Sequence, residues 1–391
     1  MKTRKKSFMR EVVSDLSAAG IILFIVFFLG LLLGAALVFL MIIGSGLALA
    51  GSIAFTLMIP GFLVVGYLLN RWFSRTVAGS RRRISEPFKE RSVHPAEYTS
   101  RYRNRFLLQR FTTLGLMIAV FTISTILLGI LLASSDLCCI CLPVTFPVLM
   151  VSVTVPAVGW VLFAYAFDPY EPEPRAFLVI AMTWGMLSTF PSLFINSFNA
   201  TWMGDLGLDV SLVSAPIFEE LFKALGFVLV ISQIKDETDG VIYGASIGAG
   251  FSLLENLFYG TISIIEGDGA LVILLVLFRS FFNIVGHMLG PAAIGFLIGW
   301  VKTIHDRKKQ SEKAMYLMGL VGVVTFGYVF GMTVHAAWNF FAGLEGWWVL
   351  LLFPYGFFQL FLFVMMVLTA FFLGTRRYRK RLREYDGMAS V

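Results

Sequence analysis

Long apolar stretches separated by short charged blocks form the dominant pattern of this chain. No Asp, Glu, Lys or Arg occurs from Leu16 to Asn70, which is long enough for two helices with a turn near Gly44. Because about 20 apolar residues cross a bilayer as a helix, the pattern predicts an all-α polytopic membrane protein. The predicted transmembrane helices, about ten in all, lie near residues 16–43, 47–69, 112–134, 144–167, 176–203, 210–234, 240–265, 271–301, 315–344 and 347–373.

Composition agrees with this pattern. Hydrophobic residues make up 58% of the 391 residues, and charged residues only 14%. A soluble domain of this length could not bury so much apolar surface. Basic residues precede the first apolar run, as in a secretory signal, but the run is long enough for a helical hairpin, so we expect it to stay uncleaved.

The basic residues predict the orientation. Apart from Lys223 and Arg279, every Lys and Arg falls in a tail or loop that the ten-helix arrangement places on one side of the membrane. The loops on the other side carry only acidic charges. By the positive-inside rule, both termini are predicted to be cytosolic in a multi-pass protein of the plasma membrane. The basic clusters then anchor the chain against anionic lipid, and no nucleic-acid partner is implied.

Ionisable residues inside predicted helices are confined to the four helices between residues 210 and 344. A charged side chain at mid-bilayer costs about 2.5 to 3.5 kcal/mol, so each one indicates a functional role. The charged residues are Glu219, Glu220, Lys223, Glu255 and Arg279, and the polar residues that accompany them are His287, His335, Asn256, Asn283 and Asn339.

Helical spacing groups these residues on common faces. Residues four apart lie on one side of a helix, so Arg279, Asn283 and His287 form one stripe, and His335 and Asn339 form another. Small residues at the same spacing accompany the polar faces and favour close helix packing, so the faces are expected to point at one another. The glycine pairs are Gly30 with Gly34, Gly244 with Gly248, Gly286 with Gly290, Gly295 with Gly299, and Gly327 with Gly331.

The depth of these polar residues in the membrane indicates that most of them lie in a single layer. With a rise of 1.5 Å per residue, Glu219, Glu255, Arg279 and His335 lie about 15 Å from the outer helix ends. His287 comes out deeper, at about 20 to 25 Å, so depth alone does not assign it to the layer.

Buried glutamates beside imidazoles suit general acid and base chemistry on a water molecule, and Asn or Arg can stabilise a developing oxyanion. No GxSxG, HExxH or DDxxD motif offers another mechanism. One alternative is that Lys223 and Arg279 only neutralise glutamates to hold the helices together. Another is a proton-coupled or ion-coupled transporter using the same carboxylates and histidines, which is disfavoured because residues 1–175 contain no counterpart of the polar half.

Four motifs in order carry a resemblance. APIFEELFKALGF contains EExxK at Glu219 to Lys223, and GFSLLENLFYG contains FxxxEN from Phe251 to Asn256. FRSFFNIVGH then supplies an Arg and a His, and HAAWNF a final His and Asn. These motifs resemble the PrsW family of intramembrane proteases, distant relatives of CAAX prenyl proteases and bacteriocin-processing membrane proteases. The resemblance covers residues 155–345, and the segment YEPEPR, before the predicted helix at 176–203, is also similar to that family.

The resemblance implies an intramembrane endopeptidase that cleaves a membrane-anchored protein such as an anti-sigma factor. It implies that Glu219 and Glu220 activate water, assisted by His287 and His335. Glu255, Asn256 and Asn339 would complete the site, with Asn283 in support, while Lys223 and Arg279 tune its charge. A glutamate-type enzyme needs no cofactor, whereas a metal-dependent one would hold zinc with His287, His335 and Glu220, and both interpretations stay open. A third possibility is an inactive relative that only binds membrane partners, which the presence of every expected acid and imidazole disfavours.

The expected organisation has three parts. Residues 1–142 supply about three N-terminal spans with a basic cytosolic loop at 71–110, residues 143–345 form the protease core, and residues 346–391 add a final span and a basic cytosolic tail. The crowded Cys138, Cys139 and Cys141 are interpreted as thiols packed at a helix end. His94 and His305 lie in predicted loops and receive no role, and the sequence assigns no oligomeric state.

Overall fold

A computed structural model describes residues 115–132, 141–168, 173–265, 269–308 and 313–389. Within these ranges the chain is helical and contains no strand. Seven of the described helices are long and apolar enough to cross a membrane. The prediction of an all-α multi-pass membrane protein is therefore confirmed. The hairpin at 16–43 and 47–69, the loop at 71–110, Cys138, Cys139 and His94 lie outside the described residues.

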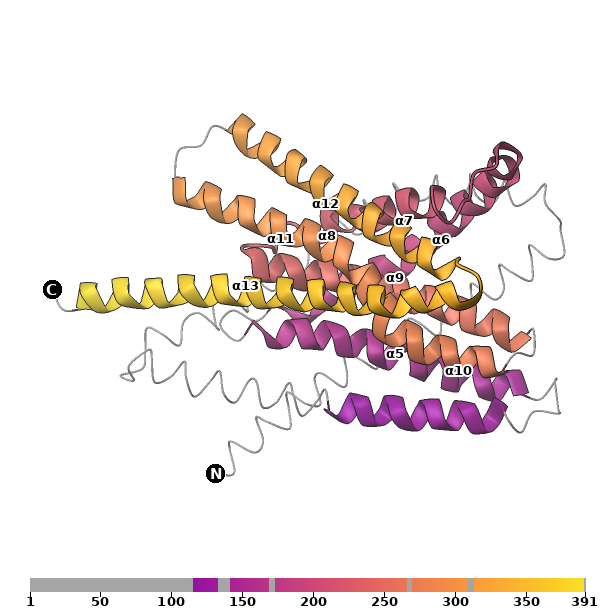
Figure 1. Ribbon diagram of the computed structural model, residues 1–391. Coiled ribbons are helices and arrows are strands. Elements are labelled where there is room, and N and C mark those ends of the chain that lie inside the picture. Colours follow the sequence, from indigo (N-terminus) through magenta and orange to yellow (C-terminus); the bar gives the residue numbers. More distant parts are fainter. Residues whose placement is uncertain (1–114, 133–140, 169–172, 266–268, 309–312, 390–391) are drawn as a thin grey trace, which may run out of the picture.

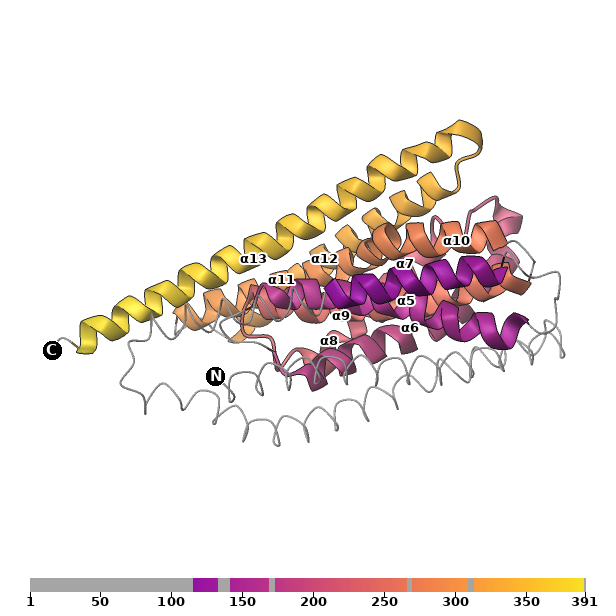
Figure 2. The ribbon, with the colours of Figure 1, turned by 90° about the horizontal axis from the view of Figure 1, so that it is seen from below.

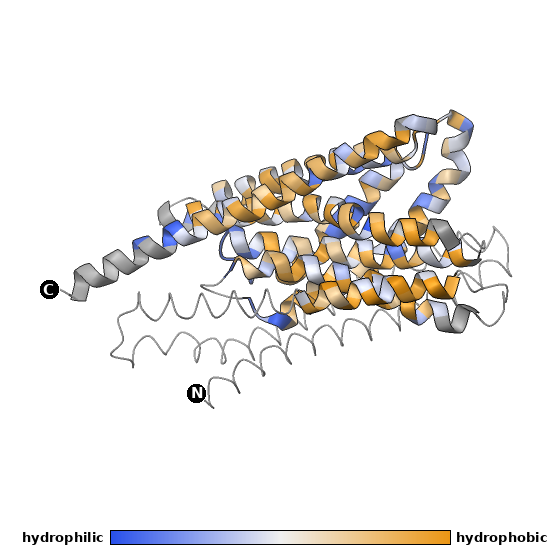
Figure 3. Cartoon of the chain, turned by 60° about the horizontal axis from the view of Figure 1, so that its bottom comes forward, coloured by the Kyte–Doolittle hydropathy of each residue, from blue (hydrophilic) through white to orange (hydrophobic). Residues whose placement is uncertain are grey.

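The helices run side by side as a bundle, with α13 along one flank (Figures 1 and 2). Among the described residues, apolar residues occupy most of the helices' length, and polar residues gather near helix ends and at the centre (Figure 3). Among the described residues, the first helix is Gly115–Leu132. It is followed by α5 Cys141–Ala166, α6 Arg175–Met203, η1 Gly204–Leu206, α7 Ser214–Leu225, α8 Phe227–Val230, α9 Glu237–Ile265, α10 Gly269–Phe278, η2 Arg279–Asn283, α11 Ile284–Lys308, α12 Lys313–Ala342, η3 Gly346–Leu351 and α13 Leu352–Ala389.

Helix α9 lies at the centre of the bundle. In its most apolar stretch 89% of the residues are buried, against 17% in α12. It packs against α5, α6 and α11. A Cβ added at Gly244 would collide with the backbone at Pro291, and one at Gly248 with the backbone at His287. The predicted close approach along these glycines is therefore confirmed for α9 and α11, and it brings Glu255 beside α11.

The segment expected as one span at 210–234 differs from the prediction. It forms two short helices, α7 of 12 residues and α8 of 4 residues, joined at Gly226. The indole of Trp184 covers this glycine, where a Cβ would lie 3.0 Å from its Nε1, and that indole nitrogen donates to the carbonyl of Phe222. The helical path therefore breaks at Gly226, where Trp184 packs against the backbone, and the buried Glu220 and Lys223 of α7 lie inside the bundle.

The segment predicted as one span at 271–301 is a continuous helical path with a local change of winding. A π-helical turn, η2, joins α10 to α11. The backbone carbonyl of Ser280 in this turn accepts a hydrogen bond from Trp160 Nε1 at 3.1 Å. π-Turns leave backbone groups without their usual helical partners and are common at functional sites. Here the turn carries Arg279 and Asn283, both of which the sequence places in the candidate site.

Candidate active site

Several helical segments bring the predicted polar residues together in the interior. The two acids and the lysine of the EExxK motif come from α7, Glu255 and Asn256 from α9, Arg279 and Asn283 from η2, His287 from α11, and His335 from α12. Among them Glu220, Lys223, Asn283 and His287 are nearly or fully shielded. The convergence that the sequence predicted is thus present in the structure.

Glu220 is tied to two cationic or hydrogen-donating groups through one oxygen. Its Oε1 accepts from Lys223 Nζ at 2.7 Å and lies 3.1 Å from His335 Nδ1. Its Oε2 faces the closely packed Gly290 and Gly331, where an added Cβ would lie 2.5 and 2.9 Å away. Because a carboxylate only accepts, His335 carries its proton on Nδ1 in this contact. Glu220 therefore fixes the orientation of His335.

His287 is held from both sides. Lys223 Nζ lies 2.7 Å from its Nδ1, and Glu255 Oε2 lies 2.7 Å from its Nε2. An ammonium group can only donate, so Nδ1 accepts and Nε2 carries the proton that faces Glu255. The ring lies edge to face with that of His335, with centroids 5.0 Å apart. His287 therefore joins the layer, which depth alone left undecided.

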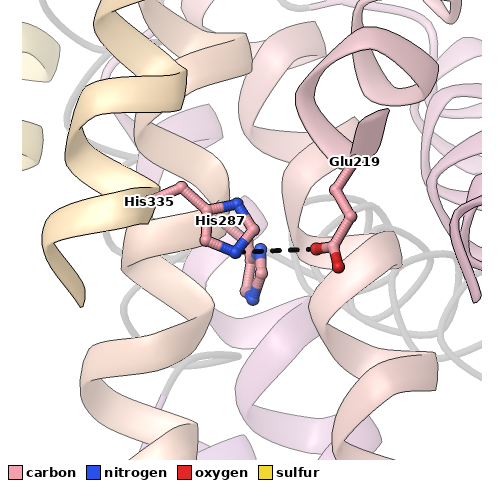
Figure 4. A group of neighbouring side chains, drawn as sticks. All are labelled: Glu219, His287 and His335. Carbon is pink, nitrogen blue, oxygen red and sulfur yellow. Dashed lines mark ion pairs between the residues drawn. The ribbon is translucent and has the colours of Figure 1, made fainter. Parts of the chain in front are cut away.

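Glu219 and His335 face each other across a short gap. Glu219 Oε2 lies 3.6 Å from His335 Nε2 and makes no hydrogen bond to the described part of the chain (Figure 4). With its proton on Nδ1, a neutral His335 presents a bare acceptor at Nε2. Two acceptors that face each other at this distance suit a proton donor or a cation between them. The side chains on either side of this gap could therefore hold a water molecule or a metal ion.

A second polar group supports the site from α9 and η2. Arg279 pairs with Glu255 Oε2 at 2.8 Å, and its Nε donates to Asn256 Oδ1 at 2.6 Å. Ser252 Oγ donates to Asn283 Oδ1 at 3.0 Å and accepts from Asn256 Nδ2 at 3.3 Å. These contacts hold Glu255 against His287.

Asn339 lies apart from this centre. Its Nδ2 donates to the backbone carbonyl of Ser211 at 2.7 Å, and the contact is exposed. It sits one helical turn beyond His335, so the stripe that the sequence predicted is present, but the side chain ties α12 to the segment before α7. The physical reason is that α7 begins at Ser214, leaving Ser211 as an open carbonyl within reach.

Comparison with known proteins identifies the family. A family profile described as "PrsW family intramembrane metalloprotease" matches residues 173–371, just over half of the chain. The chain belongs to the PrsW family. It is 27% identical over 198 residues to a protein named Protease PrsW from Geobacillus kaustophilus, covering 47% of this chain and 84% of that relative. It is 24% identical over 206 residues to Protease PrsW from Bacillus subtilis, covering 51% and 85%. No solved structure matches.

The resemblance drawn from the four motifs is therefore confirmed, and this PrsW family member is a membrane protease. Family membership favours proteolysis over the transporter alternative. The matched region begins at Glu173, just before α6, and reaches into α13. It includes every polar residue of the site and leaves the helix at Gly115–Leu132 and α5 outside.

The side chains present fit a metal ion. Glu219, His287 and His335 each offer a ligand atom, and these atoms lie within 4.8 Å of one another. Two histidines and a glutamate are a known donor set for catalytic zinc, and ligating histidines commonly donate their other nitrogen to a carboxylate, as His335 does to Glu220. The sequence prediction placed Glu220 in this set. The structure brings Glu219 there instead, because Lys223 and His335 already engage Glu220.

Sequence reasoning missed Asn196 on α6. Its Nδ2 donates to Glu219 Oε1 at 3.1 Å, although the span containing it holds no charged residue. A usable signal was present in the polar residues at positions 196 and 199, which share one face of an otherwise apolar helix. The sequence prediction did not include this position because it considered asparagines only on helices that also carry ionisable residues.

Proposed function

We propose that this PrsW family protease cleaves a peptide bond in a membrane-anchored protein at the gap between Glu219 and His335. The observation that carries the proposal is the pair of facing acceptors, Glu219 Oε2 and His335 Nε2, held 3.6 Å apart. Each is anchored on its far side, Glu219 by Asn196 and His335 by Glu220. A water molecule bridging the two would be oriented and polarised before the substrate arrives.

The reaction adds water across the peptide bond. Glu219 accepts a proton from the water, and the water oxygen attacks the carbonyl carbon. The proton then passes to the amide nitrogen as the carbon to nitrogen bond breaks. Glu220 keeps the proton of His335 on Nδ1, so Nε2 stays directed at the reacting position. Lys223 compensates the charge of Glu220 inside the bundle.

For a metal-dependent reaction, zinc is the cofactor we propose for the set Glu219, His287 and His335, and Glu219 would then be a ligand of the ion instead of the base that accepts the proton. When bound, the ion would polarise the attacking water and the scissile carbonyl. Both nitrogens of His287 are engaged in the structure, by Lys223 and by Glu255, so His287 can act as a ligand only after one of these contacts opens.

We further propose a placement for the whole chain. It has about ten spans with both termini in the cytosol of a cell membrane, and residues 143–345 form the protease core between an N-terminal part, 1–142, and a C-terminal part, 346–391. An anti-sigma factor is the candidate substrate. The buried site and the apolar helices around it support a substrate that is itself embedded in lipid.

The test is cleavage by the full-length protein in proteoliposomes that contain single-span membrane substrates. We expect Glu219→Gln, Glu220→Gln and His335→Ala to lower turnover by about 100-fold or more, because each removes a group that orients water or moves its proton. Glu345→Gln is the matched control, since this acid lies exposed after α12. Equal turnover by all the variants would refute the proposed function.

A further inference from the structure

A hydrogen-bonded chain leads from the outer part of α6 to Glu219. Trp202 Nε1 donates to Asn199 Oδ1 at 3.3 Å, and Asn199 Nδ2 donates to Ser214 Oγ at 2.8 Å. Ser214 Oγ donates in turn to Asn196 Oδ1 at 2.8 Å, and Asn196 Nδ2 donates to Glu219 Oε1 at 3.1 Å. Every link is a side chain, and the links join α6 to α7.

Trp202, at one end of this hydrogen-bonded chain, sets the direction in which every bond donates. An indole N–H can only donate, so Asn199 must present its oxygen to Trp202 and its NH₂ to Ser214. Ser214 accepts that bond and gives its own hydrogen to the oxygen of Asn196. Asn196 is then left with its NH₂ toward Glu219. A flipped amide would instead place two oxygens against each other, so the chain fixes which end of Asn196 meets the carboxylate.

Burial keeps these hydrogen bonds in the direction described. Ser214 is 2% exposed and Asn199 8%, so neither can readily exchange its partners for bulk water. The three α6 residues stand at positions 196, 199 and 202, which lie on one face of the helix, and Ser214 is the first residue of α7. The packing of α6 on the start of α7 therefore holds the chain together.

We propose that Asn196 is a positioning residue for proteolysis, which orients Glu219 by holding Oε1 and leaving Oε2 directed at His335. The inference rests on the proposed function of Glu219 at the reacting position. Without this bond, either oxygen could turn toward His335 and the carboxylate could rotate between them. Asn196 acts through Glu219 and has no direct role toward the substrate.

The isosteric variant Asn196→Asp gives the sharpest test, because it keeps the shape of the side chain and replaces the donor with an acceptor. We expect Asn196→Asp to lower kcat by about 10- to 100-fold with KM unchanged, and to be at least as damaging as Asn196→Ala. A side chain that only fills space would show the reverse order, with Asp milder than Ala. Observing that order, or a wild-type kcat, would overturn the proposal.

Neighbouring Ser197 supplies the matched controls. It lies exposed on the same helical turn, so Ser197→Asp and Ser197→Ala should leave kcat and KM unchanged. Thermal unfolding in detergent should show all four variants folded, with midpoints close to that of the wild type. A loss of activity in Asn196→Asp that is matched by Ser197→Asp would assign the effect to charge in the helix and refute the positioning role.

A variant at Ser214 tests the hydrogen-bonded chain independently. Ser214→Ala removes the hydrogen that holds the oxygen of Asn196 and should lower kcat several-fold with KM unchanged, since the amide can then flip. A wild-type kcat in both single variants, Ser214→Ala and Asn196→Asp, would overturn the inference. If Glu219→Gln is inactive while Asn196→Asp is fully active, the inference alone fails. If Glu219→Gln is fully active, the proposed function itself fails.

Discussion

Lys223 Nζ lies 2.7 Å from His287 Nδ1, so the lysine of the EExxK motif is joined directly to a histidine on another helix. The same ammonium donates to Glu220 Oε1 at 2.7 Å and lies 4.1 Å from the centre of the Phe251 ring. One fully buried cation therefore links α7, α9 and α11. It holds an acid and an imidazole of the site in fixed positions.

Replacing Lys223 by Met should destabilise the protein by about 3 to 5 kcal/mol, because the buried Glu220 then loses the charge that compensates it. The measurement is the free energy of unfolding in detergent. Arg376→Met, at an exposed position, is the control and should change it little.

The double variant Lys223→Met with Glu220→Gln separates charge from packing. It should recover part of the lost stability while remaining inactive, since no unpaired charge is left by this pair inside the bundle. A double variant as unstable as the sum of both single variants would contradict the pairing.

Substitution of Gly331 by Ala should lower both stability and activity. A Cβ at this position would lie 2.9 Å from Glu220 Oε2 and 3.0 Å from the Cα of Gly290, so the helices or the carboxylate must shift. We expect a cost of about 1 to 3 kcal/mol and reduced turnover, measured by thermal unfolding and by cleavage in proteoliposomes.

Gly322 on the same helix provides the comparison. Nothing lies within 4 Å of a Cβ added there, so Gly322→Ala should be tolerated and should slightly stabilise the helix. If Gly331→Ala and Gly322→Ala had equal effects, the contact with Glu220 would not be the reason that position 331 requires glycine.

Metal removal should abolish cleavage if Glu219, His287 and His335 hold zinc. A chelator should inactivate the wild type, and added zinc should restore its activity. Elemental analysis of the purified protein should show zinc that is lost in His335→Ala and kept in His305→Ala, since His305 packs against Tyr316 near the end of α11, away from the site. Full activity in a metal-free preparation would exclude the zinc mechanism and support the glutamate-type mechanism, in which the chain's own carboxylate activates water.

The middle of α13 is joined by side-chain contacts to the start of α9. Arg377 forms ion pairs with Asp236, at 3.1 Å, and with the buried Glu237, while Thr238 Oγ1 donates to the carbonyl of Ala370. Arg377→Ala should cost about 1 to 3 kcal/mol of unfolding free energy because it leaves Glu237 without this charge partner. Arg376, exposed on the same turn, supplies the control variant Arg376→Ala, which should change stability by less than about 0.5 kcal/mol. An equal response of both variants would argue against the fastening role.

Local sequence patterns were sufficient to predict many of the membrane helices and most residues of the candidate site. The length of the uncharged runs predicted membrane helices, because a bilayer demands about 20 apolar residues from each crossing helix. The cost of charge in lipid singled out residues such as Glu220 and His335 from their positions along the chain alone. The order of the motifs pointed to the PrsW family, which the family comparison confirms.

Two local predictions were revised by packing. The helix expected at 210–234 is the pair α7 and α8, which break at Gly226, where the indole of Trp184 lies against the backbone. Asn339 has the predicted spacing from His335 yet bonds to Ser211. Spacing determines the face of a helix but leaves open which partner lies opposite it.

The sequence by itself therefore determined that this is an α-helical membrane protein and which acids and imidazoles it carries within the membrane. Only the tertiary structure decided that Glu220 is held by Lys223 and His335 while Glu219 keeps an oxygen directed at the gap, and that neutral Asn196 stands behind it. The physical reason is that hydrophobicity and helical period act within one segment. Hydrogen-bond direction and side-chain pairing instead depend on how separate helices are rotated against each other.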